Sequence, residues 1–144
     1  MQSRIEYMEI APGAMKTLFG LEKYLAECGL EPSLIDLIKL RASQINGCAY
    51  CIDMHTKDAR ARGESDQRLY ELVAWRETPF YTERERAVLA WTEAVTLIAG
   101  SHVPDEVYEQ ELVNLTLALV AINGWNRFAI SFRTVPGTYQ PASH

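Results

Sequence analysis

The amino-acid sequence predicts an all-α protein that forms a single domain over residues 1–144. No segment shows the sustained alternation of apolar and polar residues that is typical of a half-buried strand. Apolar residues instead recur at helical spacing, in stretches separated by glycines that end helices and by capping residues that begin them. A chain of this length buries roughly two thirds of its unfolded surface, so it does not require a disulfide in order to fold.

The first half of the chain carries the signals of three helices. Residues 13–27 have apolar side chains at helical spacing, and Gly29 ends this helix because glycine readily adopts the left-handed conformation. A second helix is predicted over residues 32–45, and it begins with a proline whose fixed φ suits the first turn. Asn46-Gly47 interrupts the chain. A third helix then runs over about residues 48–62.

Further helix starts follow in the second half of the chain. Ser65 is a suitable N-cap for a helix that runs to about residue 75. Thr82 and Glu85 have the spacing of a capping box, and they begin a helix that runs to about residue 99. Pro104 and Asp105 begin the next helix.

The segment 109–132 is also predicted to be helical, and its middle part is apolar around nearly the whole circumference. A helix that is apolar all round is buried on all sides. A small domain has few elements with which to surround such a helix, so we expect a second subunit to cover part of it. The sequence therefore predicts a homo-oligomer, with a central core helix of a monomer as the alternative. Residues 135–144 are rich in Pro, Gly and Ser and are expected to be loose.

Composition and charge weigh against several function classes. The formal net charge is -5 and the basic residues are scattered, whereas nucleic-acid binding needs clustered Lys and Arg. The N-terminal residues lack the apolar core of a signal peptide. The longest apolar-rich stretch falls short of the ~20 residues that span a bilayer. We therefore expect a protein of the cytoplasm with no nucleic-acid or membrane partner. Reducing conditions in the cytoplasm keep cysteines free.

The stretch CAYCIDMH, residues 48–55, carries the candidate chemistry. Residues advance about 100° each on a helix, so Cys48, Cys51 and His55 share one stripe. At i, i+4 spacing the imidazole of His55 is placed to take the Cys51 proton directly or through one water. Cys48 follows the helix break, where free N–H groups favour a thiolate. The neighbouring histidine would activate Cys51, whereas the position at the helix start would make Cys48 the more acidic thiol. The sequence leaves both possibilities open.

Three interpretations of this motif compete. A thiol pair at this spacing can pass through a disulfide in redox or peroxide chemistry. A zinc site would use Cys48, Cys51 and His55 with Cys28 as an imagined fourth ligand, but no second ligand pair follows in the sequence. The third interpretation is a pair of buried thiols that only pack. We favour redox chemistry, because the pair follows a helix break and shares its face with an imidazole.

The CxxCxxxH motif placed after LIKLRASQING resembles the AhpD-like alkylhydroperoxidase branch of the carboxymuconolactone decarboxylase family, and INGWNRF at residues 122–128 adds to the resemblance. The resemblance covers most of the chain and is strongest over residues 34–63. It implies an AhpD-like helical fold of about six to seven helices and homo-oligomers, commonly trimers or hexamers. It also implies thiol peroxidase or disulfide reductase activity without a metal or other cofactor.

The resemblance also implies roles for individual residues. The second cysteine of the family motif attacks peroxide and the first resolves it, so Cys51 would be the peroxidatic thiol and Cys48 the resolving thiol. His55 would be the relay base. The family glutamate, twelve positions before the first cysteine, corresponds to Asp36, which is one methylene shorter. A helical wheel places Asp36 on a solvated face, so its catalytic role rests on the resemblance or on burial by another subunit.

The sequence thus predicts an oligomeric, cofactor-free thiol-dependent (alkyl)hydroperoxide reductase. Its partners would be an organic or hydrogen peroxide as substrate and an external dithiol as reductant. The alternative from another class is a thiol redox sensor or disulfide-exchange protein without significant peroxidase turnover. A decarboxylase of the same superfamily is disfavoured, because those members generally lack the cysteine pair.

Overall fold

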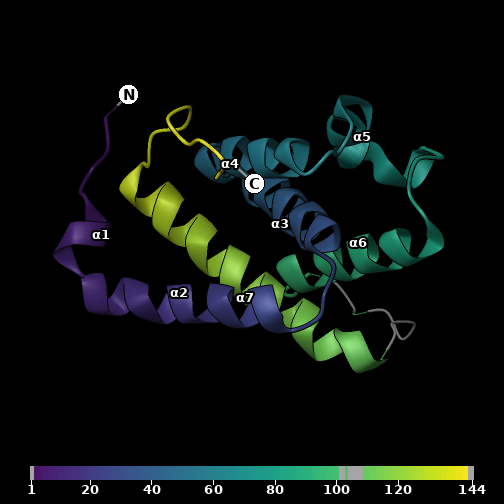
Figure 1. Ribbon diagram of the computed structural model, residues 1–144, viewed down its shortest axis with the longest axis horizontal. Coiled ribbons are helices and arrows are strands. Elements are labelled where there is room, and N and C mark those ends of the chain that lie inside the picture. The colour runs from purple at the N-terminus through teal and green to yellow at the C-terminus, as the bar shows by residue number, and fades with distance from the viewer. Residues whose placement is uncertain (1, 101–102, 104–108, 143–144) are drawn as a thin grey trace.

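The computed structural model describes residues 2–100, 103 and 109–142, and all regular elements in this part of the chain are helical (Figure 1). The all-α prediction is therefore confirmed. The predicted helix start at Pro104-Asp105 lies outside the described residues. None of the described helices combines the length and apolarity needed to cross a membrane. The elements in chain order are α1 (Tyr7–Ile10), α2 (Pro12–Glu27), α3 (Pro32–Asn46), α4 (Ala49–Ala61), α5 (Asp66–Glu71), the 3-10 helix η1 (Leu72–Glu77), α6 (Glu83–Thr96) and α7 (Glu109–Phe132).

The predicted capping signals form at the helix ends. Thr82 and Glu85 make both reciprocal bonds of a capping box at the start of α6. The Ser65 hydroxyl accepts the Arg68 N–H at 3.3 Å and caps α5. The helix predicted to run to residue 75 is wrong in its second half, because Ala74 leaves helical geometry and the chain tightens into η1. Helix α6 also ends earlier than predicted, and the short α1 was not predicted.

Helix α3 is the central element of the domain. It packs against α4, α6 and α7, and Figure 1 shows it beneath α4 in the middle of the molecule. More than half of its side chains are buried, and they point in all directions around the helix. The buried set is Leu34, Asp36, Leu37, Ile38, Lys39, Leu40, Ala42 and Ser43. Polar side chains of α3 therefore face other parts of the protein.

Helix α7 is not enclosed by the other described elements of the chain. Val113, Val120 and Ile130 keep 75%, 55% and 47% of their surface exposed. The opposite face packs against α2, α3 and α6. The helix that the sequence marked as buried on all sides thus has an apolar outer face within a single chain.

The C-terminal segment folds back over α4 after α7 ends (Figure 1). The Lys57 ammonium donates to the carbonyl oxygens of Gly137 and Tyr139 at 3.2 and 3.1 Å. The Gly137 N–H donates to the Asp53 carboxylate at 2.9 Å. The expectation of a loose tail is wrong at Gly137 and Tyr139, because Lys57 and Asp53 of α4 supply polar partners for their backbone.

Candidate active site

The α3–α4 junction places the two motif cysteines side by side. Gly47 adopts a left-handed conformation with φ of 68°, which ends α3 and turns the chain directly into α4. Cys48 is the N-cap of α4, and its Sγ accepts the backbone N–H of Cys51 at 3.4 Å. The thiol of Cys48 thus lies against the free N–H groups at the start of a helix, where an anion is favoured.

Both thiols are free and each is 1% exposed, yet their acidities differ. The pKa of Cys48 is lowered to about 7, mainly because the Cys51 thiol donates a hydrogen bond to it. The pKa of Cys51 is raised because its proton is held by Cys48 and because the group is buried. Cys48 is thus the more acidic thiol. This order agrees with the prediction from its position at the helix start, and not with the prediction that His55 activates Cys51.

Asn126 from α7 is a further polar neighbour of the thiol pair, and it is fully buried. Its amide lowers the pKa of both cysteines as a hydrogen-bond partner. Asn46 donates to its Oδ1 at 2.8 Å, and its own Nδ2 donates to Ser43 Oγ at 3.1 Å. Asn126 was not predicted as a site residue, although it lies in the INGWNRF stretch that carries part of the family resemblance.

A cavity of about 570 Å³ lies beside the cysteine pair, within the size range of small-molecule sites. Cys51, His55 and Asp36 all line it, whereas Cys48 does not. The structure therefore brings three of the four predicted site residues to one surface and leaves the fourth behind Cys51. Most of the remaining wall is apolar or aromatic and includes Tyr7, Phe19, Leu25, Ile35, Met54 and Trp125.

His55 is buried in the wall of this cavity in its neutral form. Its pKa is lowered to about 3, mainly by burial and also by the positive charges of Lys39 and Arg62. Its Nδ1 lies 4.0 Å from Asp58 Oδ2, which is too far for a direct hydrogen bond. Its Nε2 has no hydrogen-bond partner among the described residues. Nε2 is thus a buried nitrogen without a protein partner, and among the described residues no direct hydrogen bond joins His55 to Cys51.

Asp36 is only 5% exposed, so the helical-wheel prediction of a solvated face is wrong. The Arg62 guanidinium, which follows the end of α4, donates to both carboxylate oxygens at 2.6 Å. Burial raises the pKa of Asp36, and the bond from Arg62 opposes this rise. The wheel failed because α3 is surrounded by other elements, so a polar residue on any of its faces becomes enclosed.

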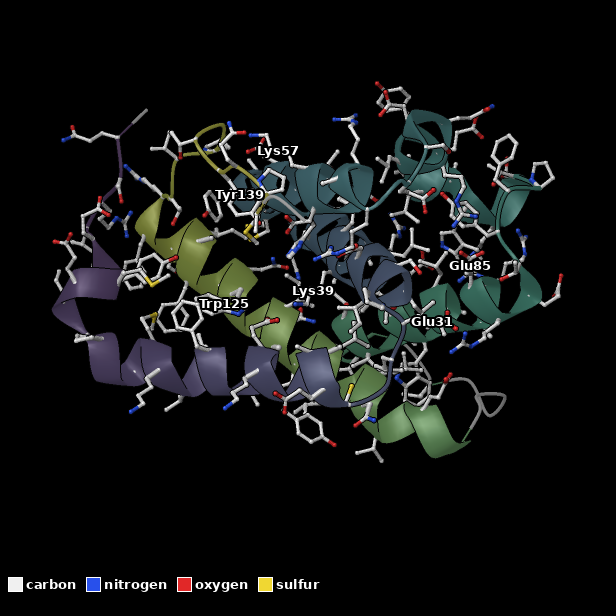
Figure 2. All side chains as sticks on the ribbon, viewed as in Figure 1. Glu31, Lys39, Lys57, Glu85, Trp125 and Tyr139 are labelled. Carbon is white, nitrogen blue, oxygen red and sulfur yellow. The ribbon has the colours of Figure 1, made fainter. Side chains whose placement is uncertain are left out.

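A second ion pair with one buried partner lines the same cavity and was not predicted. Lys39 of α3 is 8% exposed and pairs with Glu22 of α2. The other oxygen of Glu22 accepts the indole N–H of Trp125 at 3.1 Å. Figure 2 labels Lys39 and Trp125 in the region between α2 and α4. Lys39 interrupts the apolar residues of α3 one turn after Asp36, and this spacing was the one trace of the polar face in the sequence.

The arrangement of donors does not suit the zinc interpretation. Within the described ranges, no three His, Cys, Asp or Glu side chains converge in a way that could hold a metal ion. Cys28, the imagined fourth ligand, lies at the end of α2, where its thiol donates to the Leu25 carbonyl at 3.3 Å.

Comparison with known proteins gives two close relatives. The uncharacterized protein YdfG of Bacillus subtilis (strain 168) is 46% identical over an alignment of 139 residues, and the match covers 91% of this chain and 95% of YdfG. The crystal structure of an Agrobacterium tumefaciens protein of unknown function, described as a putative antioxidant defence protein AhpD, is similar with a TM-score of 0.91. That pair is 45% identical and covers 96% of this chain and 100% of the other.

More distant structures share the fold. The debrominase Bmp8 in complex with 2,3,4-tribromopyrrole is similar with a TM-score of 0.80 at 18% identity, over 91% of this chain and 74% of the other. The model of the carboxymuconolactone decarboxylase family matches residues 12–94, which is more than half of the chain. The chain belongs to the carboxymuconolactone decarboxylase family, and its all-helical fold is AhpD-like.

Proposed function

We propose that this protein is a thiol-dependent hydroperoxide reductase in which Cys51 attacks the peroxide and Cys48 resolves the product. The observation that carries the proposal is that Cys51 and His55 line one cavity of about 570 Å³ while Cys48 contacts Cys51 from behind. Family membership supports it, as does the description of the Agrobacterium relative as a putative antioxidant defence protein.

The reaction balances with these groups and one dithiol. The Cys51 thiolate attacks the O–O bond of a peroxide ROOH, takes one oxygen as a sulfenic acid and releases RO⁻, which is protonated to ROH. The Cys48 thiol then condenses with the sulfenic acid, which forms the disulfide and releases water. An external dithiol reduces that disulfide and is itself oxidised to a disulfide.

The acidity of the pair sets how Cys51 becomes nucleophilic. When the pair is singly ionised, Cys48 carries the charge and Cys51 the proton, since the Cys51 thiol donates to Cys48. Transfer of that proton to Cys48 moves the charge to the sulfur that lines the cavity. Asn126 partners both sulfurs, so its hydrogen bonding supports either position of the charge. His55 and Asp36 then orient a water that protonates the leaving RO⁻.

We also infer that the protein works as a homo-oligomer, a trimer or a hexamer, in the cytoplasm. The exposed valines at positions 113 and 120 of α7 are the residues that a second subunit would cover. The external dithiol that reduces the enzyme belongs to the same reducing compartment.

Steady-state peroxide consumption with a dithiol donor tests the proposal. We expect Cys51→Ser to abolish turnover and Cys48→Ser to reduce it strongly. Cys28→Ser is the matched control, because Cys28 lies outside the cavity and its loss should leave turnover unchanged. Turnover that survives in Cys51→Ser would remove this thiol from the mechanism.

The redox-sensor alternative is supported by one observation, the 1% exposure of both thiols, which restricts access of a bulky reductant. It predicts a different result in the same assay. A sensor consumes one equivalent of peroxide per thiol pair and then stops, even with excess dithiol present.

A further inference from the structure

The C-terminal segment brings a tyrosine into the cavity that the motif residues line. Tyr139 and Lys57 lie together over α4 (Figure 2). Lys57 holds the segment through its bonds to the carbonyls of Gly137 and Tyr139, and it also pairs with Asp53 at 2.9 Å. These bonds fix the backbone on both sides of residue 138, so the Tyr139 ring is presented to the cavity in a defined position.

The hydroxyl of Tyr139 meets the carboxylate that faces His55. It donates to Asp58 Oδ1 at 2.6 Å, and the other oxygen, Oδ2, lies 4.0 Å from His55 Nδ1. Burial raises the pKa of Tyr139 to about 12, so its hydroxyl remains a donor at neutral pH. The tyrosine thereby holds the Asp58 carboxylate in place, with one oxygen turned toward the imidazole.

A fixed carboxylate 4.0 Å from Nδ1 is too far for a direct hydrogen bond, but its charge biases which ring nitrogen carries the proton. The negative oxygen attracts an N–H and repels a lone pair, so it favours the tautomer protonated at Nδ1. The lone pair then lies on Nε2, the buried nitrogen that has no partner among the described residues. A peroxide O–H or a relay water that reaches this nitrogen from the cavity would then find a hydrogen-bond acceptor.

We propose that Tyr139 and Asp58 are positioning residues that hold His55 in the Nδ1-protonated tautomer, so that the C-terminal segment forms part of the reaction site. This inference rests on the proposed role of His55 in peroxide reduction. Neither residue touches the reacting sulfur, and both act through the imidazole.

The first test is independent of turnover. Nitrogen NMR of isotopically labelled protein reports the protonation of each imidazole nitrogen, and the His55 signals are those lost in His55→Gln. We expect the wild type to carry its proton at Nδ1, and Tyr139→Phe and Asp58→Asn to shift the ring toward a mixture of tautomers. Tyr24→Phe is the matched control, because it removes a hydroxyl that donates to Asn114 at an exposed site. Unchanged His55 shifts in both cavity variants would overturn the proposal.

The second test separates positioning from general structural support. Tyr139→Phe should lower kcat on the order of tenfold, as loss of an outer-shell partner does. The double variant with Asp58→Asn should lose no more than the stronger single variant, because both residues act through one ring. Tyr139→Phe should cost nothing further in a His55→Gln background. An additional tenfold loss in that background would refute action through His55. If the protein turns out not to reduce peroxides, the NMR result still decides the positioning question.

Discussion

Replacing Cys51 tests the origin of the acidic thiol. The hydrogen bond from the Cys51 thiol is the largest cause of the lowered pKa of Cys48. Cys51→Ala removes that donor, whereas Cys51→Ser keeps an O–H at the same place. A hydrogen bond to a charged group is worth about 1.5–3 kcal/mol, which corresponds to roughly one to two pH units in the pKa of the acceptor.

The expected result follows from that magnitude. With a pKa of about 7, half of the Cys48 thiols are ionised at pH 7. In Cys51→Ala the pKa should rise to about 8–9, and the ionised fraction at pH 7 should fall to roughly a tenth or less. Cys51→Ser should keep the pKa close to the wild-type value, since a serine hydroxyl is also a donor.

Ultraviolet absorbance of the thiolate, followed as a function of pH, measures these values directly. A Cys28→Ser background leaves Cys48 as the single thiol in each Cys51 variant. Thermal unfolding of each variant shows whether the fold is retained. A pKa that stays near 7 in Cys51→Ala would refute the reasoning, because the helix start and Asn126 would then account for the acidity without Cys51.

Two other predictions concern stability and assembly. The pKa of His55 is lowered to about 3 from an unfolded value of 6.5, so the unfolded chain binds a proton first and stability is lost as pH falls below 6.5. Between pH 7 and pH 5, the free energy of unfolding of His55→Gln should therefore fall by about 2 kcal/mol less than that of the wild type, as measured by denaturant unfolding. Equal falls in the two proteins would contradict a buried neutral imidazole. Val120→Asp on the outer face of α7 should lower the mass of the oligomer, as measured by light scattering. If the variant has the same mass as the wild type, the subunit contact lies elsewhere.

The helices were largely predictable because their signals are local. The capping box at Thr82, the N-cap at Ser65 and the left-handed Gly47 each act within one turn of the chain. The failures have equally local causes. Apolar periodicity continues through Ala74, where the backbone leaves the helix, and the four-residue α1 begins without a side-chain cap.

The motif residues were also predictable in part, because a stripe on one helix needs no knowledge of its neighbours. Cys51 and His55 do line one cavity, and Cys48 contacts Cys51. The residues that surround them come from other elements. Asn126 arrives from α7 and Tyr139 from the C-terminal segment, and nothing in the spacing along α4 indicates either.

The polar stripe of α3 explains why Asp36 was misplaced. Asp36, Lys39 and Ser43 lie at i, i+3 and i+7, so they share one face of an otherwise apolar helix. On a helix that covers the outside of a domain, such a stripe faces solvent. Here the three residues are 5%, 8% and 0% exposed, because α3 lies at the centre and its polar face meets the cavity and Asn126. Burying these charges is costly unless each is paired, and the partners Arg62 and Glu22 come from the end of α4 and from α2. A helix can therefore carry a polar stripe either because that face meets solvent or because it meets an internal site. Only the partners that neighbouring helices supply distinguish the two cases.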